Sequence, residues 1–151
     1  MTQRSKISLA TQSRVRSRAH GLCEYCHTIE KWQLIPFTID HVIPLSKGGT
    51  NNFNNLALAC FHCNRYKSNL TEVLDAKTNT LIPLFNPRLQ QWSDHFIWAA
   101  DKLYILGLTA VGKITIEQLR LNRERIIRIR AADLQINRHP PAGDPVTADS
   151  R

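Results

Sequence analysis

The chain has 151 residues, of which 42% are hydrophobic and 21% charged, a composition typical of one globular domain and unlike that of a disordered chain. Its formal net charge of +8 favours a polyanionic partner, and nucleic acid is the common one. No apolar run approaches the ~20 residues of a membrane span, and the N-terminus lacks a signal-peptide apolar segment, so the sequence predicts a cytoplasmic protein with no membrane partner.

The N-terminal 19 residues are predicted to form a basic arm and a helix. Residues 1–7 contain no apolar pattern, and a helix is expected from about Ser8 to Ala19, with Ser8 or Thr11 as N-cap. Gly21 can end this helix, after which the segment LCEYC is predicted to form a tight turn.

The middle of the chain alternates between strand and loop signals. Residues 33–43 are rich in β-branched and aromatic residues, which predicts a strand, and Pro36 favours an edge strand or a bulge. Pro44 and the Gly48-Gly49 pair break this pattern, and a polar loop follows at 50–55. The segment that starts at Leu56 is predicted to be a loop that enters a short helix, roughly Phe61 to Ser68.

The C-terminal part is predicted to contain a hairpin and two helices. A connector over residues 81–92 precedes a hairpin formed by 95–99 and 103–108. Thr115-x-x-Gln118 is a capping-box pattern that predicts the start of a helix, and Asn122 could cap a second helix that runs to about Leu134. The buried face predicted for this second helix contains Ile126, Ile127, Ala131 and Leu134. Residues 137–151 have no apolar pattern and are predicted to be a disordered tail.

The four cysteines form two C-x-x-C pairs with none left over, namely Cys23, Cys26, Cys60 and Cys63. Two such pairs can present four thiolates to one Zn²⁺, and four sulfur ligands close its coordination shell, so the ion would be structural. The alternatives are a redox C-x-x-C, which needs a thioredoxin-like βαβ setting, and independent free thiols. His20, His27 and His62 lie near the cysteines and could replace a ligand, but with four thiols available we interpret them as surface histidines.

Three residues between and beside the cysteine pairs suit phosphodiester hydrolysis. This reaction needs an activated water and a cation that stabilises charge on the phosphate. A histidine such as His41 suits the first task, whereas the carboxylate of Asp40 and the amide oxygen of Asn64 suit a hard cation such as Mg²⁺. Because neighbours on a strand point to opposite faces, Asp40 and His41 are expected to serve different tasks.

The pattern DHVIPLSKGG…NNLALAC-x-x-CN-x-x-K resembles the HNH endonuclease family, the ββα-metal or His-Me finger nucleases, in its four-cysteine zinc form. The resemblance implies that His41 is the general base and that Asp40 and Asn64 are ligands of a catalytic Mg²⁺ or Mn²⁺. It also implies that Asn55 holds the loop of the histidine, and it matches Lys67 with the lysine of the family's CN-x-x-K.

The resemblance implies an α+β fold, with a zinc-stapled ββα-metal (HNH) core followed by a C-terminal β-hairpin and helices. The expected organisation is a basic arm and helix at 1–19, the nuclease core with the zinc site at 20–70, an extension at 71–136 and the tail at 137–151. Residues 84–123 also resemble a downstream region of one bacterial branch of the family, although that branch tends to carry proline where this chain has Glu124. His95 lies in this region and could reach the site, but we interpret it as a structural histidine beside Trp92 and Trp98.

The predicted function is therefore metal-dependent cleavage of DNA. The basic residues expected to contact nucleic acid are Lys47, Arg65, Lys67, Arg125 and Arg128. A non-catalytic, zinc-stapled nucleic-acid binder is the alternative, although such a binder has no need of Asp40, His41 and Asn64 together. Zinc-mediated protein interaction is a third hypothesis, which the charge of +8 does not favour. The oligomeric state is left open.

Overall fold

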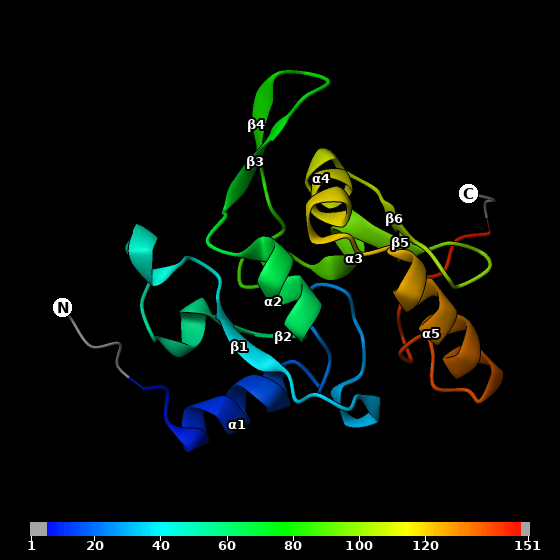
Figure 1. Ribbon diagram of the computed structural model, residues 1–151, viewed down its shortest axis with the longest axis horizontal. Helices are drawn as coiled ribbons and strands as arrows, with labels where there is room; N and C mark the ends of the chain where they lie inside the picture. The colour runs from blue at the N-terminus through cyan, green and yellow to red at the C-terminus, as the bar shows by residue number, and fades with distance from the viewer. Residues whose placement is uncertain (1–5, 149–151) are drawn as a thin grey trace.

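The structure, a computed structural model, describes residues 6–148, so residues 1–5 of the predicted arm and 149–151 of the predicted tail lie outside the described part. Short helices and three two-stranded sheets form an α+β fold, which confirms the predicted fold class (Figure 1). None of the helices in the described part is both long and apolar enough to cross a membrane. In chain order the elements are α1 (Leu9–Arg18), η1 (Glu30–Trp32), β1 (Thr38–His41), η2 (Leu45–Lys47), η3 (Phe53–Asn55), β2 (Leu56–Ala59), α2 (Phe61–Lys67), β3 (Glu72–Asp75), β4 (Thr80–Pro83), α3 (Trp92–His95), β5 (Phe96–Trp98), β6 (Ile105–Gly107), α4 (Ala110–Leu119) and α5 (Glu124–Gln135).

The centre of the fold is the antiparallel pair β1–β2, with α1 packed on β2 and α2 packed on β1 (Figure 1). Asp40 lies opposite Ala57, and His41 lies opposite Leu56. The sequence predicted a loop where β2 lies, which is wrong. All four β2 side chains are small or apolar and all are buried, so the alternation that marks a half-exposed strand is missing.

Helix α1 begins where the sequence predicted, with Ser8 as its N-cap. The Ser8 hydroxyl accepts a hydrogen bond from the Thr11 backbone N–H at 3.1 Å. On the opposite end of the helix, Arg18 donates to the backbone oxygens of Phe53 and Leu56, so its charge is used to hold β2 rather than to face solvent.

The loop between β1 and β2 depends on the two glycines that the sequence pointed to. Gly48 ends η2 with φ of +87°, a conformation that favours glycine. Gly49 packs so closely that a Cβ atom built on it would lie 1.7 Å from the carbonyl oxygen of Ile43. Any other residue at Gly49 would therefore displace the segment that follows His41.

The C-terminal part contains the predicted hairpin, formed by β5 and β6, and a second hairpin that the sequence did not predict. This second hairpin, β3–β4, projects from the body of the molecule at the top of Figure 1. Its strands expose Leu74 and Leu81, which lie opposite each other.

Helix α4 starts six residues earlier than predicted. Its N-cap is Thr109, whose hydroxyl accepts from the Gly112 backbone N–H at 3.1 Å. Thr115 is fully buried inside the helix, where its hydroxyl donates to the Val111 carbonyl at 2.7 Å and accepts from the Phe85 backbone N–H at 2.9 Å. The predicted capping box at Thr115 is therefore wrong, because the hydroxyl serves tertiary packing instead.

Helix α5 follows the predicted break, but Asn122 does not cap it. The Asn122 side chain instead bonds the backbone N–H and carbonyl of Ile105, each at 2.8 Å. On the inner face of α5, Ile126 and Arg130 are buried, whereas the other three residues predicted to be buried, Ile127, Ala131 and Leu134, are only half-buried. Arg130 can be buried because it donates to the carbonyl oxygens of Leu103 and Leu121.

Residues 138–148 are ordered by contacts with Trp98, so the prediction of a disordered tail is wrong for this segment. The Asp144 carboxylate accepts from Trp98 Nε1 at 2.9 Å and lies 2.8 Å from His27 Nδ1. The backbone of Trp98 bonds both Pro145 and Thr147. These contacts are polar and distant in sequence, so hydrophobic periodicity could not reveal them.

We expect Asp144→Ala to lower the free energy of unfolding by about 1–3 kcal/mol, because the buried Trp98 Nε1–H loses its acceptor. Urea unfolding followed by tryptophan fluorescence measures the change. Asp94→Ala, at an exposed position of α3, is the matched control and should change the unfolding free energy little. Equal stability of the two variants would mean that the Asp144 side chain contributes nothing to the stability of the fold.

Candidate zinc centre and active site

The four cysteines meet in one buried cluster. Their Sγ atoms all lie within 4.8 Å of one another, and those of Cys26 and Cys60 are 3.8 Å apart. Four thiolates about 2.3 Å from one tetrahedral Zn²⁺ would have Sγ–Sγ separations of about 3.8 Å. The chemistry and spacing of the donors therefore fit a structural zinc ion, as the sequence predicted.

The pKa values of the clustered thiols also favour a bound cation. Burial raises the pKa of the Cys23 thiol well above its usual range, and hydrogen bonds with the neighbouring thiols raise that of Cys63. Hydrogen bonds from the same neighbours lower the pKa of Cys26. The thiols thus compete for protons when no metal is bound. A divalent cation bound to the four sulfurs would let all of them carry negative charge in this buried site.

Backbone and side-chain contacts join the two cysteine pairs to β2. The Glu24 backbone N–H donates to the Leu58 carbonyl at 2.8 Å, and the Leu58 N–H donates to the Glu24 carboxylate at 2.8 Å. Cys60 is the N-cap of α2, where its Sγ accepts from the Cys63 backbone N–H at 3.4 Å. The cluster thus fixes the first loop, β2 and the start of α2 relative to one another.

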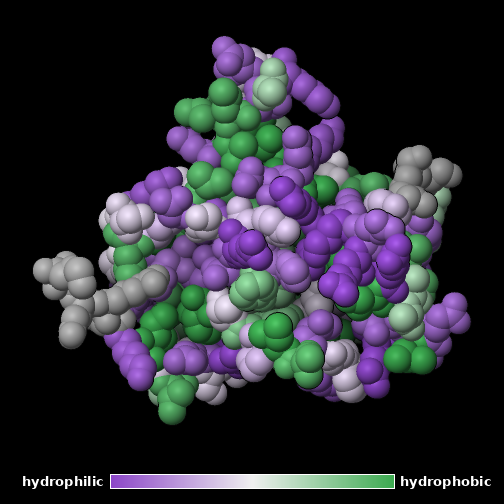
Figure 2. Space-filling model, viewed as in Figure 1, coloured by the Kyte–Doolittle hydropathy of each residue, from purple (hydrophilic) through white to green (hydrophobic). Residues whose placement is uncertain are grey.

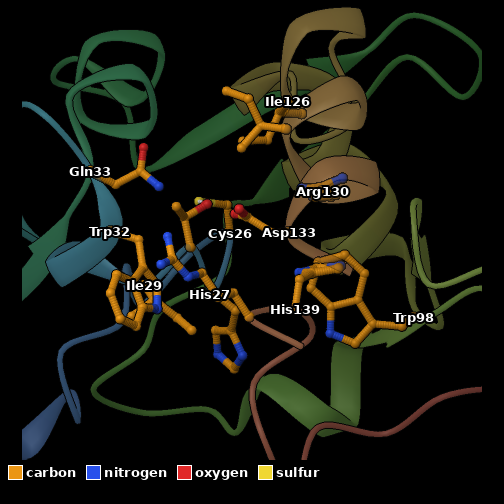
Figure 3. Close-up of a pocket in the computed structure, with 13 residues that line it drawn as sticks. Cys26, His27, Ile29, Trp32, Gln33, Trp98, Ile126, Arg130, Asp133 and His139 are labelled. Atoms are coloured by element: carbon orange, nitrogen blue, oxygen red, sulfur yellow. Dashed lines mark hydrogen bonds between the residues drawn. The ribbon is translucent and has the colours of Figure 1, made fainter. Parts of the chain in front are cut away.

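The cavity beside the cluster is too small for a substrate. It has a volume of about 20 Å³ and lies between Cys26, α5 and the tail, with Arg130, Trp98 and His139 on its wall (Figure 3). This is roughly the room that one water molecule needs. This cavity is therefore not a candidate substrate site.

The histidines near the cysteines take no part in the cluster. His20 is exposed and His62 is half-buried. The interpretation of His27 as a surface histidine is wrong, because its side chain is 15% exposed and its ring stacks on Trp92 at 4.0 Å. His95 has structural contacts, since its Nδ1 lies 2.6 Å from the Thr109 hydroxyl. The imidazole of His95 meets the ring of Phe85 edge to face, with the ring centroids 5.7 Å apart.

Asp40 and His41 end β1 in different environments, as expected for neighbours on a strand. The Asp40 carboxylate is buried and accepts from the Tyr25 hydroxyl at 2.7 Å, and Lys67 Nζ lies 3.2 Å from its Oδ2. Burial raises the pKa of Asp40, while the Lys67 ammonium and the Tyr25 hydrogen bond oppose this shift. His41 Nε2 lies 2.7 Å from the Asn51 side-chain oxygen.

Asn55 fastens the loop that follows His41. Its side-chain oxygen accepts from the Ile43 backbone N–H at 2.9 Å. Its amide nitrogen donates to the carbonyl oxygens of Ile43 and Thr50, at 3.0 and 2.8 Å. The two ends of the loop are thus tied together directly after His41.

Asn64 lies half-buried on α2, directly after Cys63 and three residues before Lys67. Residues three apart share one face of a helix, and Lys67 contacts Asp40, so this face of α2 is turned toward β1. Asp40 and Asn64 carry the oxygen donors that Mg²⁺ and Mn²⁺ prefer, and the chemistry of this donor set fits such an ion.

Asn51 is a contact of the candidate site that the sequence did not single out. The loop offers four asparagines, at positions 51, 52, 54 and 55, and no local pattern distinguishes one that reaches back to His41. Only the path of the loop places Asn51 against the imidazole.

The basic residues divide into exposed and structural ones. Lys47, Arg65, Arg125 and Arg128 are exposed, as nucleic-acid contacts must be. Lys67 is only 2% exposed and is paired with Asp40, so the prediction that it contacts nucleic acid is wrong.

Figure 2 shows hydrophilic side chains gathered over the junction between α2 and the C-terminal helices. Two further arginines also lie in this part of the chain, Arg120 over the ring of Tyr66 and Arg123 at the N-cap of α5.

Residues 23–70 match the family model described as HNH endonuclease. The matched segment contains both cysteine pairs, β1, β2 and α2. The resemblance seen in the sequence is thereby confirmed for this segment. A comparison with curated proteins finds no match for the chain.

Proposed function

We propose that this chain, which carries an HNH endonuclease domain over residues 23–70, is a divalent-metal-dependent DNA endonuclease that hydrolyses phosphodiester bonds. The observation that carries the proposal is the setting of His41. Its imidazole is bonded by Asn51, and Asn55 clamps the backbone immediately after it. A purely structural histidine on β1 has no need of this support.

The proposed task of His41 is to take the proton of the attacking water. An amide oxygen only accepts hydrogen bonds, so contact with Asn51 favours the tautomer with the proton on Nε2 and makes Nδ1 the basic nitrogen. A base held in one orientation transfers protons efficiently. This supports His41 as the general base.

In the same proposal, Asp40 and Asn64 hold the catalytic Mg²⁺ or Mn²⁺. When bound, such an ion supplies positive charge that stabilises the scissile phosphate and the leaving oxygen. The zinc centre has a separate task, because four sulfur ligands leave no position for water. It keeps β2 and α2 in place, and with them Asn64 on α2 and Asp40 on β1, the strand that pairs with β2.

Incubation of supercoiled plasmid with the purified protein tests the proposal. We expect nicked or linear DNA with Mg²⁺ or Mn²⁺, and intact supercoiled DNA when a chelator of these ions is present. Absence of cleavage with every divalent metal tested would instead support a non-catalytic, zinc-stapled nucleic-acid binder. The burial of Asp40 between Tyr25 and Lys67 is the observation that favours this second function, since a buried polar cluster can be purely structural.

The exposed arginines of α5 are proposed to contact phosphates, which predicts a change in salt dependence. Arg125→Gln with Arg128→Gln should make the slope of log affinity against log salt shallower by up to about 1.8, at roughly 0.9 for each phosphate contact that is lost. Fluorescence anisotropy of a labelled duplex at several salt concentrations measures the slope. Lys77→Gln, in the turn of the β3–β4 hairpin, is the control and should leave it unchanged. A double variant with the wild-type slope would exclude both arginines from the interface.

A further inference from the structure

Two buried titratable residues have no part in the function proposed above, and both contact Asp40. Tyr25 is fully buried, and Lys67 is 2% exposed. The Tyr25 hydroxyl donates to Asp40 Oδ2 at 2.7 Å. Lys67 Nζ lies 3.2 Å from Oδ2 and 3.4 Å from Oδ1. Burying an ammonium group and a carboxylate costs desolvation energy, which is offset only where well-formed contacts hold both groups in a defined geometry.

The two contacts come from the two halves of the zinc site. Tyr25 lies between Cys23 and Cys26, and its backbone carbonyl accepts from Trp92 Nε1 at 2.9 Å. Lys67 lies four residues after Cys63, on the helix that Cys60 caps. Asp40 is therefore held from one side by the first cysteine pair and from the other side by the second.

The contacts are unequal on the two oxygens of Asp40. Oδ2 accepts the short bond from Tyr25 and the nearer contact from Lys67, whereas Oδ1 has, among residues 6–148, only the 3.4 Å contact. An ionised carboxylate has about four lone-pair sites, so Oδ1 keeps the capacity to bind a cation. Lys67 Nζ also donates to the His41 carbonyl at 3.0 Å, which joins the proposed ligand and the proposed base through one ammonium group.

We propose that Tyr25 and Lys67 are positioning residues that fix Asp40 as a ligand for the catalytic divalent cation and thereby couple the zinc centre to the active site. The inference rests on the proposed function in so far as Asp40 binds that cation. Groups that hydrogen-bond a metal ligand orient it, and their loss weakens metal binding while the ligand itself remains. Zinc then acts on catalysis through Tyr25 and Lys67, without activating water itself.

The test compares two variants with matched controls elsewhere in the chain. Tyr25→Phe removes one hydroxyl, and Tyr66→Phe removes a hydroxyl from a half-buried ring on α2. Lys67→Met removes the buried ammonium, and Lys113→Met removes an exposed one. For each protein, elemental analysis gives the zinc content, and electron paramagnetic resonance with Mn²⁺ alone gives the dissociation constant of the second metal.

We expect Tyr25→Phe and Lys67→Met to keep one zinc per chain and to raise the Mn²⁺ dissociation constant about 10–100-fold, the usual effect of losing such a contact. The Mn²⁺ concentration that half-saturates plasmid nicking should rise by the same factor. Both controls should behave as wild type. If Lys67→Met loses zinc because an unpaired buried carboxylate prevents folding, the nearly isosteric Tyr25→Phe decides the question.

Unchanged Mn²⁺ affinity in zinc-loaded Tyr25→Phe would overturn the inference, and so would a wild-type protein that binds no Mn²⁺. If wild type binds Mn²⁺ more tightly than Tyr25→Phe does, yet cleaves no plasmid with any divalent metal, the proposed nuclease function is contradicted and the positioning role of Tyr25 stands.

Discussion

Replacement of Cys60 by serine is expected to remove zinc from the protein and to unfold its core. Apparent binding energies of roughly 10–16 kcal/mol for structural zinc are as large as, or larger than, the net stability of about 5–15 kcal/mol that domains have. Serine is a good N-cap, so the hydroxyl can still serve the start of α2, and the variant isolates the loss of the thiolate ligand. Elemental analysis and a thermal melt followed by circular dichroism measure the two effects.

Chelation provides the comparison that needs no mutation. Wild type stripped of zinc should melt at the temperature at which Cys60→Ser melts. Zinc added afterwards should restore the melting transition of wild type but not that of Cys60→Ser. Folded wild-type protein that contains no zinc, and that melts at the same temperature with or without the chelator, would contradict the structural role of the metal.

His41→Ala is expected to lower plasmid nicking by about 10²–10⁴-fold, the usual contribution of a positioned general base. Zinc content and DNA affinity should stay near wild type, because His41 contacts the loop residue Asn51 and is not part of the cysteine cluster.

The control for His41→Ala is His20→Ala, which changes an exposed histidine next to the first cysteine pair. This variant should nick plasmid as wild type does. Equal nicking by wild type and His41→Ala, in preparations with equal metal content, would remove His41 from the mechanism.

Of the two proposed ligands of the catalytic cation, Asn64 gives the clearer mutational test. Asp40→Ala would leave the Lys67 ammonium buried without its carboxylate, so lost activity in that variant would mix metal binding with stability. Asn64→Ala avoids this problem, since Asn64 is half-buried and carries no charge. We expect it to raise the metal concentration needed for nicking while the zinc content stays the same.

The sequence by itself determined the features that depend on residue type and short spacing. Two C-x-x-C pairs are local patterns whose chemistry is the same wherever the chain places them, and the sulfurs do meet in one cluster. The Ser8 cap of α1 and the β5–β6 hairpin are also local, since the contacts that form them lie within a few residues of one another. The family resemblance likewise rests on one continuous segment.

The tertiary structure decided what each polar or charged side chain does, because those contacts join residues far apart in the sequence. Lys67 looked like a phosphate contact, but it is buried on Asp40, 27 positions away. Asp144 looked like part of a disordered tail, but it bonds His27, 117 positions away. A lysine or aspartate has the same sequence signal when it faces solvent and when it faces a buried partner. Only the packing of β1, α2 and the tail around the zinc centre separates the two.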